Sequence, residues 1–409
     1  MNESRTNCRI CHSSNIQTVL SLGITPLADA LRRKEQLSGA EPVFPLNVAF
    51  CPQCSLMQLV ETVPPEVLFC QDYPYYSSFS PALLKHSQAN ALDLIDSRGL
   101  NPASLVIELA SNDGYLLKNF VKRGIPVLGI DPAEGPAEAA KKVGVPTLCT
   151  FFGASLAREL SASGKAADVI IGNNVLAHVA DLHGFVEGIR TLLKEDGVAV
   201  IEMPYVKDLV DHCEFDTIYH EHLCYFSVTA LDYLFRMHSL FLNDVKHLSI
   251  HGGSLRIYVE KRENVSPAVR SMLRIEAVEK VNHFDYYRNF AEKVEGIAKE
   301  LRRVLRCFKE QGARIAAYGA AAKGSTLINY CGIGAELIDF VVDRNTHKQG
   351  LYMPGQQIPV LAPEALTDQM PDYVLLLAWN FADEILKQQK EYRQHGGRFI
   401  IPVPNPRVL

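Results

Sequence analysis

Short apolar runs that end in a polar turn or an acidic residue recur in the first half of the chain. Residues 105–110 form such a run, the polar turn 111–114 follows, and helical spacing of apolar residues begins at Tyr115. The next run, 127–130, ends at Asp131. This order of buried strand, tight turn and helix is typical of a parallel α/β sheet. Two further strands of the same sheet are predicted at residues 167–172 and 197–204.

The same pattern returns in the last third of the chain. An amphipathic stripe predicts one long helix over residues 287–311, and residues 314–318 then form a strand. A turn of small residues, 319–326, leads into the next helix, and a second strand ends at Asp343. A third strand is predicted at 373–380. We therefore predict an α/β protein with two Rossmann-like halves behind a smaller N-terminal domain. The alternative is that the second half is a structural duplicate that has lost its ligand.

The composition narrows the class of protein. A chain of 409 residues predicts two or three domains. Apolar residues make up 47% and charged residues 21%, which excludes a mostly disordered chain. The net charge of −5 argues against a general nucleic-acid binder. No run approaches the ~20 apolar residues of a membrane span, and the polar start of the chain lacks the pattern of a signal peptide. We expect a cytoplasmic monomer that has neither nucleic acid nor membrane as a partner.

Two closely spaced cysteine pairs lie in the first 54 residues. Cys8 and Cys11 form one C-x-x-C pair, Cys51 and Cys54 form the other, and 39 residues separate the pairs. Four thiolates complete the tetrahedral shell of a structural zinc ion, so we predict such a site in preference to two unrelated pairs of reduced cysteines. His12 is a conceivable substitute ligand. The other six cysteines are predicted to be small buried hydrophobic residues, namely Cys70, Cys149, Cys213, Cys224, Cys307 and Cys331.

The turn after the first strand has the features of a cofactor loop. Gly114 is its one glycine, so the turn is not G-x-G-x-x-G and a dinucleotide is disfavoured. The strand, turn and helix instead resemble class I S-adenosylmethionine (SAM) methyltransferases, although Asn112 and Asp113 stand where many of those enzymes have a glycine-rich loop. There the acid after strand two, here Asp131, holds the ribose; its alternative role is a helix N-cap. The resemblance assigns the cofactor to Glu108, Ala110, Ser111, Asn112, Gly114, Tyr115, Leu116, Asp131, Pro132, Asn173 and Asn174.

Residues 215–226 contain the densest cluster of ionisable side chains. Two histidines, His220 and His222, flank Glu221, and Tyr219 and Tyr225 lie on either side. The spacing is not H-E-x-x-H, and adjacent side chains do not converge on one metal ion, so a zinc-protease site has no support. Histidine and glutamate together supply a base tunable to neutral pH and a partner that orients it. We predict an active site here; the alternative is a polar surface loop.

Three further segments are candidates for ligand contacts. In the segment 251–256, two glycines permit close approach of the backbone to a ligand. The small-residue turn 319–326 resembles a phosphate-binding turn to which Lys323 adds charge, but it lacks the Walker spacing and predicts no NTP hydrolysis. Trp379 ends the third strand and offers an indole for stacking on a base. The segment 72–78 holds three tyrosines around Pro74.

Taken in order, these motifs are similar to one known family. C-x-x-C, C-x-x-C, Y-P-Y-x-S-S, E-L-A-S-N-D-G, Y-H-E-H, H-G-G-S-L-R, Y-G-A-A-A-K-G and V-V-D-x-N resemble the C-methyltransferases of nucleotide-4-keto-deoxysugars, which make branched sugars for antibiotics and bacterial surface glycans. The resemblance covers essentially the whole chain. It implies a zinc-binding domain (1–70), a SAM domain (71–285) and a domain for the nucleotide-linked sugar (286–409), with SAM and structural zinc as cofactors.

The resemblance also implies a reaction and a role for each residue. A base removes the proton at C3, next to the 4-keto group, and the enolate that results takes the methyl group of SAM. His222 is implied as the base, with His220 as its competitor; Tyr219 donates to the enolate oxygen, and Glu221 orients or tunes the base. His178, with Tyr73 or Tyr75, positions the sugar. The substrate-binding residues implied are His251, Gly252, Ser254, Arg256, Tyr318, Gly319, Ala320, Lys323, Gly324, Asp343, Lys348, Trp379 and Asn380.

Other functions stay open on the sequence. An O- or N-methyltransferase of the same class of sugar would need the same cofactor and no C3 proton exchange. A non-catalytic zinc protein that senses a nucleotide sugar or SAM would bind these molecules without turnover. An RNA methyltransferase suits neither the net charge nor the absence of a basic stripe in the sequence.

Overall fold

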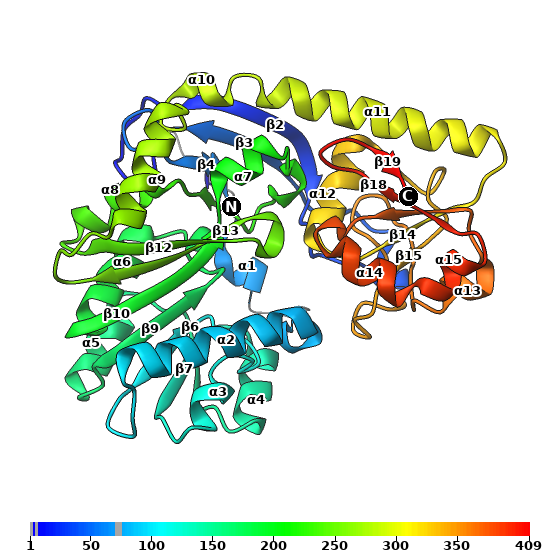
Figure 1. Cartoon of the computed structure of the whole chain (residues 1–409). Helices are drawn as coiled ribbons and strands as arrows, with labels where there is room; N and C mark the ends of the chain where they lie inside the picture. The colour runs from blue at the N-terminus through cyan, green and yellow to red at the C-terminus, as the bar shows by residue number, and fades with distance from the viewer. Residues whose placement is uncertain (1–2, 5–6, 70–75) are drawn as a thin grey trace.

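The structure is a computed structural model that describes residues 3–4, 7–69 and 76–409. It contains a small N-terminal sheet, a large central sheet and a C-terminal sheet, and the long helix α11 (Phe290–Glu310) runs across the top of the molecule towards the C-terminal sheet (Figure 1). The predicted fold class, α/β with two Rossmann-like halves behind an N-terminal domain, is confirmed. Among the described residues, no helix is both long enough and apolar enough to cross a lipid bilayer.

The N-terminal sheet takes one of its four strands from a distant part of the chain. Strands β2, β3 and β4 pair antiparallel, and β11 (Cys224–Tyr225) pairs with β4. The segment around Tyr219–His222 is therefore anchored to the N-terminal sheet. The elements of this part are β1 (Glu3–Ser4), β2 (Gln17–Pro26), η1 (Lys34–Gln36), β3 (Val43–Phe50), β4 (Met57–Leu59), β5 (Glu61–Thr62) and α1 (Pro65–Phe69).

The central sheet has the strand order β12-β13-β10-β9-β6-β7-β8. Five neighbouring strands are parallel, and β13 runs antiparallel to β10 and β12. These strands read as near-continuous apolar runs because helices cover both faces: α2, α3 and α4 pack on one face and α5, α6 and α8 on the other. The strands are β6 (Val106–Leu109), β7 (Val127–Asp131), β8 (Thr147–Cys149), β9 (Ala167–Asn173), β10 (Leu193–Pro204), β12 (Phe241–Leu248) and β13 (Ser254–Glu260).

Helices and short turns complete the central part. The helix α2 begins at Pro81 behind the N-cap Ser80, whose side chain accepts a hydrogen bond from Leu83 N, and it ends at the left-handed Gly99. The remaining elements are η2 (Ser77–Phe79), α2 (Pro81–Arg98), α3 (Lys118–Val121), α4 (Glu134–Lys142), α5 (Ala154–Ala162), η3 (Leu176–His178), α6 (Leu182–Leu192), α7 (Val206–Asp211), η4 (Phe215–Thr217), α8 (Val228–Met237), η5 (Ile250–Gly252), α9 (Pro267–Val278) and α10 (Phe284–Tyr287).

The C-terminal sheet repeats the parallel arrangement on a smaller scale. Its order is β16-β15-β14-β17-β18-β19, and the strands are parallel except for β19 at one edge. The elements are β14 (Ile315–Tyr318), α12 (Ala322–Cys331), β15 (Val341–Val342), β16 (Val360–Leu361), α13 (Ala365–Gln369), β17 (Tyr373–Leu376), η6 (Trp379–Phe381), α14 (Ala382–Gln388), α15 (Lys390–Gln394), β18 (Arg398–Ile401) and β19 (Arg407–Val408).

Four details differ from the sequence predictions. The third strand of the C-terminal half ends at Leu376, so Trp379 lies in η6 and not in the strand. The long helix begins at Phe290, because the chain leaves the helical path after α10. The strand before Asp343 is confined to Val341–Val342, since only these residues pair with β14 and β16. Cys149 is exposed and Cys307 half-buried, whereas Cys213, Cys224 and Cys331 are buried as predicted; Cys70 lies outside the described residues. The domain boundaries at 70/71 and 285/286 stay predictions.

Candidate active site

The four N-terminal cysteines meet at one point. Their sulfur atoms all lie within 4.8 Å of one another, with Cys8 3.4 Å from Cys54 and Cys11 3.5 Å from Cys51. A tetrahedral zinc ion needs four thiolates at about 2.3 Å, so the donor set and its spacing fit zinc. In the described part of the chain these four cysteines form the one cluster able to hold a metal, and His12 is not among them.

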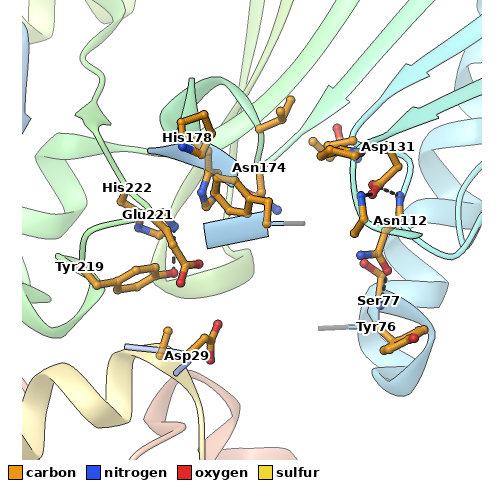
Figure 2. A pocket seen from close by; sticks show the side chains of 18 of the residues that line it. Asp29, Tyr76, Ser77, Asn112, Asp131, Asn174, His178, Tyr219, Glu221 and His222 are labelled. Atoms are coloured by element: carbon orange, nitrogen blue, oxygen red, sulfur yellow. Dashed lines mark hydrogen bonds between the residues drawn. The ribbon is translucent and has the colours of Figure 1, made fainter. Parts of the chain in front are cut away.

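A cavity of about 750 Å³ lies where the three parts of the chain meet. It opens at the carboxyl ends of β6, β7 and β9 and at those of β14, β15 and β17, which is where open α/β sheets bind their ligands. The N-terminal part also lines it, through Asp29 (Figure 2) and through Pro65, Glu66 and Phe69 of α1. We call this space the main cavity.

At the central end of the main cavity, the turn after β6 is tied to Asp131. The Asp131 carboxylate accepts hydrogen bonds from the backbone N–H of Asn112 (2.8 Å) and of Ala133 (2.9 Å) (Figure 2). Asn112 Oδ1 in turn accepts one from Ser77 N at 2.9 Å. Burial raises the pKa of Asp131. Because Ala133 is the N-cap of α4, the alternative in which Asp131 caps that helix is not realised.

The departure from a glycine-rich loop is visible in the backbone of this turn. Ala110 and Asn112 have φ values of 56° and 50°, in the left-handed region that glycine adopts most easily. The chain therefore keeps the loop conformation with two non-glycine residues, of which asparagine tolerates it better than alanine.

The predicted cofactor residues fall into two groups. Seven of them line the main cavity: Ala110, Asn112, Tyr115, Asp131, Pro132, Asn173 and Asn174. Glu108, Ser111, Gly114 and Leu116 lie behind the lining. Glu108 is fully buried in β6, where burial, and then the charges of Asp131 and Asp113, raise its pKa well above the usual range.

At the middle of the main cavity, His222 is held in one tautomer. Its Nδ1 lies 2.8 Å from the carbonyl oxygen of Thr217, which can only accept, so Nδ1 carries the proton. Its Nε2 lies 2.8 Å from the hydroxyl of Tyr219, which donates to it (Figure 2). A turn closed by His222 N on Tyr219 O (2.9 Å) brings the two side chains together. In the neutral form of His222, Nε2 is therefore the ring atom that can accept a proton.

The other predicted catalytic residues separate in the structure. Glu221 and His178 line the main cavity with His222, and the rings of His178 and His222 lie 4.7 Å apart. Burial lowers the pKa of His178 to about 4. His220 points the other way, with its Nε2 donating to Pro45 O of the N-terminal part at 3.1 Å. Tyr73 and Tyr75 lie outside the described residues.

The C-terminal end of the main cavity repeats the link between an acid and a turn, and it adds two lysines. Asp343 accepts hydrogen bonds from Ala320 N and Asn345 N, both at 2.7 Å. Lys348 donates to Ala320 O at 2.7 Å. The Lys323 ammonium lies 4.1 Å from the centre of the Trp379 ring, and no described side chain or backbone group hydrogen-bonds to it. Of the predicted residues here, Lys323, Asp343, Lys348 and Asn380 line the cavity, whereas Tyr318, Gly319, Ala320, Gly324 and Trp379 do not.

The H-G-G-S-L-R segment is not brought into the main cavity. Arg256 is buried in β13, and its Nε lies 2.5 Å from Glu202, which also accepts a hydrogen bond from His86 (2.8 Å). Ser254 donates to Ile250 O. Gly252 lines a second, smaller cavity of about 470 Å³, together with Trp379. The backbone of His251 lies in η5, but its side chain is outside the described residues.

Comparison with known proteins gives the family. C-methyltransferase NovU from Streptomyces niveus is 38% identical over 405 residues, which cover 98% of this chain and 96% of that protein. The family "Putative zinc binding domain" matches residues 8–69, "Methyltransferase domain" matches 83–238 and "C-methyltransferase C-terminal domain" matches 249–404. This chain belongs to the C-methyltransferase family. The C-methyltransferase is thus an enzyme that uses SAM and holds a structural zinc ion, and the alternative of a non-catalytic sensor falls away.

More distant relatives cover only part of the C-methyltransferase. A ubiquinone biosynthesis O-methyltransferase from Hahella chejuensis is 30% identical over 92 residues, 22% of this chain and 39% of that one. Among solved structures, a Burkholderia thailandensis 1,6-didemethyltoxoflavin-N1-methyltransferase with S-adenosylhomocysteine is 18% identical, covering 46% of this chain and 81% of that one at a TM-score of 0.34.

Several residues that line the main cavity of the C-methyltransferase carry no motif in the sequence. Asp29 lies in a loop of the N-terminal part, and the others follow β8, β15 and β17. A strand-end position was the one signal that could have found the latter group; nothing in the sequence marks Asp29. These unpredicted lining residues include Asp29, Thr150, Phe152, Arg344 and Phe381.

Proposed function

We propose that the enzyme methylates C3 of a nucleotide-diphosphate-linked 4-keto-deoxysugar through an enolate. The observation that carries the proposal is the held tautomer of His222. Nδ1 is committed to the Thr217 carbonyl, so Nε2 is the basic atom, and it faces a cavity large enough for a cofactor and a sugar nucleotide. A base of this kind suits removal of a proton next to a carbonyl.

The proton and electron transfers follow from this arrangement. His222 Nε2 takes the C3 proton, and the C–H electron pair becomes the C3–C4 double bond as the ketone oxygen gains negative charge. When bound, SAM would supply an electrophilic methyl group to the enolate carbon, and its sulfonium sulfur would leave as a thioether. Tyr219, whose hydroxyl donates to His222 in the resting enzyme, is also positioned as a donor for the oxygen that becomes charged. His178 stays neutral at physiological pH because of its lowered pKa and so presents no competing charge.

The charges at the two ends of the main cavity support this choice of ligands. Asp131 lies at the central turn with Asp113 close by, and these carboxylates suit the cationic groups of SAM. Lys323 and Lys348 lie at the C-terminal turn and suit the diphosphate of a nucleotide. The catalytic cluster lies between them.

Proton exchange at C3 tests the proposal directly. The enzyme would be mixed, without SAM, with thymidine- and guanosine-diphosphate-linked 4-keto-6-deoxysugars in deuterated water, and loss of the C3 proton followed by NMR. Wild type and the control His220→Asn should exchange this proton, whereas His222→Asn should lose at least about 100-fold in rate.

Two outcomes would contradict the proposal. If His222→Asn exchanges as fast as wild type, His222 is not the base. If the sugar is methylated but wild type never exchanges the C3 proton, the transfer is to oxygen or nitrogen, and the enolate is wrong.

A further inference from the structure

The N-terminal part contributes a carboxylate to the main cavity. Asp29 lies in the loop between β2 and β3, and its side chain is 16% exposed. Lys348 of the C-terminal part is 3.6 Å from Asp29 Oδ1, and that oxygen has no hydrogen-bond partner among the described residues. Both residues line the cavity with Glu221 of the central part. Each of the three parts of the chain thus places a charged or ionisable group at the same site.

Glu221 and Asp29 are two acids on facing walls of the cavity. Figure 2 shows the Glu221 carboxyl pointing into the space above Asp29, beside the Tyr219–His222 pair. Glu221 is 5% exposed, so ionising it would bury a charge. Two carboxyl groups that share a site rarely both ionise, and here Lys348 pairs with Asp29. The neutral member of the pair is therefore Glu221.

We propose that Asp29 is a positioning residue of the active site, whose negative charge keeps Glu221 in its neutral, hydrogen-donating form next to the reacting sugar. An ionised carboxylate can only accept hydrogen bonds, whereas a neutral carboxyl group can donate one to an oxygen that gains charge. Tyr219 already donates to His222 in the resting enzyme, so Glu221 supplies a second donor.

The electrostatics of the groups that face Glu221 agree with this geometry. Burial, and then the charge of Asp29, raise the pKa of Glu221 well above its usual range, and Lys348 acts in the opposite direction. On its own segment, Tyr219 and His222 hydrogen-bond to each other, and the lowered pKa of His178 on η3 keeps that ring neutral. Burial is the largest influence on the protonation of Glu221, and Asp29 and Lys348 are the two charges that act on it.

The pH profile of C3 proton exchange tests this role, which rests on the proposed function. Loss of the Glu221 proton should produce an alkaline limb in the profile. Asp29→Asn removes the charge that holds this proton, so the limb should move to lower pH by about one unit. Lys348→Met should move it to higher pH, and opposite shifts from two neighbours are not what misfolding would produce.

Glu41→Gln is the matched control. Glu41 is also a carboxylate of the N-terminal part that touches the C-terminal part, since it accepts a hydrogen bond from Gly355 N at 3.0 Å and pairs with Arg32 at 3.7 Å, but it does not line the main cavity. Its pH profile should match wild type. If Asp29→Asn behaves like Glu41→Gln, Asp29 does not act through Glu221 and the inference is wrong.

A measurement without substrate separates this inference from the proposed function. Infrared difference spectra of the full-length enzyme over a pH titration report the carbonyl stretch of a protonated carboxyl group. The raised pKa of the buried Glu108 gives that residue a band of its own, so the Glu221 band is the part of the signal that Glu221→Gln removes. This part should be present in wild type at neutral pH and should have a lower titration midpoint in Asp29→Asn. Equal signals in wild type and Glu221→Gln overturn the inference, whereas absence of C3 exchange with a normal Glu221 band overturns only the proposed chemistry.

Discussion

The two α/β halves of the enzyme hold an acidic residue in the same way and surround it differently. After the second strand of the central half, Asp131 accepts hydrogen bonds from the turn residue Asn112 and from Ala133, two positions further on. After the second strand of the C-terminal half, Asp343 does the same with Ala320 and Asn345. The two halves therefore share this arrangement, in which a carboxylate accepts hydrogen bonds from two backbone N–H groups.

The side chains around Asp131 differ in charge from those around Asp343. Asp131 is buried at 5% exposure with Asp113 close by, whereas Asp343 is half-buried and lines the main cavity with Lys323 and Lys348. A turn with acids suits a cationic cofactor, and a turn with lysines suits an anionic one. The comparison teaches that the two turns share a backbone arrangement and differ in their flanking charges, and the proposed function uses this difference to place the cofactor at one turn and the nucleotide at the other.

Removing Arg256 should damage the central half and leave the ligand turns intact. Burial opposes ionisation of Glu202, but the hydrogen bond from His86 and the charge of Arg256 together lower its pKa. Arg256→Met leaves this buried carboxylate poorly paired, so the free energy of unfolding should fall by about 4 kcal/mol. Urea denaturation measures the loss, with Arg270→Met, on the exposed side of α9, as control.

Affinity measurements on the same variant decide between a structural and a binding role. Where the variant stays folded, affinities for S-adenosylhomocysteine and for nucleoside diphosphates should stay within about twofold of wild type. A selective loss of nucleotide affinity would restore the substrate-binding role that the sequence predicted for Arg256.

Removing the Lys323 charge should weaken binding of a nucleotide and leave binding of the cofactor unchanged. Lys323→Met should weaken binding of thymidine or guanosine diphosphate by on the order of 10- to 100-fold, because a buried ammonium group no longer meets the phosphates. S-adenosylhomocysteine should bind as in wild type, by calorimetry. Lys309→Met, which removes a lysine paired with Asp339 away from the cavity, is the control.

The Lys323 variant also checks the fold around it. The neighbouring Glu214, whose pKa burial raises to about 7, can take up a proton and limit the cost of removing the lysine. Equal losses of affinity for the nucleotide and for S-adenosylhomocysteine would mean that the two halves do not bind their ligands independently.

Protonation of His178 at low pH should lower the stability of the central half. Its pKa of about 4 in the folded state lies below the usual 6.5, so between these values the unfolded chain binds more protons and stability falls as the pH drops. Above pH 6.5 the effect is absent. The loss in the free energy of unfolding should reach about 2 kcal/mol at pH 4. This is somewhat less than the whole pKa difference corresponds to, because the ring borders a cavity open to water.

Denaturation curves between pH 7 and 4 check this dependence. His178→Asn should flatten the slope, whereas His395→Asn, on the exposed face of the C-terminal half, should not. An unchanged slope in His178→Asn would assign the acid sensitivity to other groups.

The smallest expected change in stability concerns the residue that follows the first parallel strand of each half. Gly319 follows β14 with a φ of 101°, and Ala110 follows β6 with a φ of 56°. Ala110→Gly should relieve backbone strain and raise the free energy of unfolding by up to about 1 kcal/mol. Gly319→Ala should lower it, since the added Cβ would lie 2.7 Å from the Cβ of Ala378. Thermal unfolding of both variants checks the sign; equal signs would show that the two turns are not equivalent.

Much of this site could be predicted because its chemistry is local. A C-x-x-C pair sets the distance between two thiolates within one turn, and a strand that ends in an acid at the edge of a parallel sheet faces a ligand by geometry alone. Asp131, Asp343 and Lys323 were found in this way. Arg256 was predicted to bind substrate because a strand pattern does not reveal which face of a buried sheet a side chain meets, and β13 directs it to Glu202.

The sequence also could not decide between His220 and His222, although the two residues are close together in the chain. In an extended chain His220 and His222 would share a face. The segment instead turns after Tyr219, so that His222 meets the Tyr219 hydroxyl while His220 donates to Pro45 of the N-terminal sheet. The choice between them depended on strand β11, which anchors this segment to a sheet that begins some 200 residues earlier.

The sequence alone determined the α/β halves, the four zinc ligands and the family, because periodicity, short spacings and motif order need no knowledge of distant contacts. Only the tertiary structure decided which histidine faces the cavity, that Arg256 is paired away from it, and that Asp29 joins Glu221 and Lys348. These three outcomes share a physical reason. Each depends on a contact between parts of the chain that are far apart in sequence, and packing of the three parts brings them together.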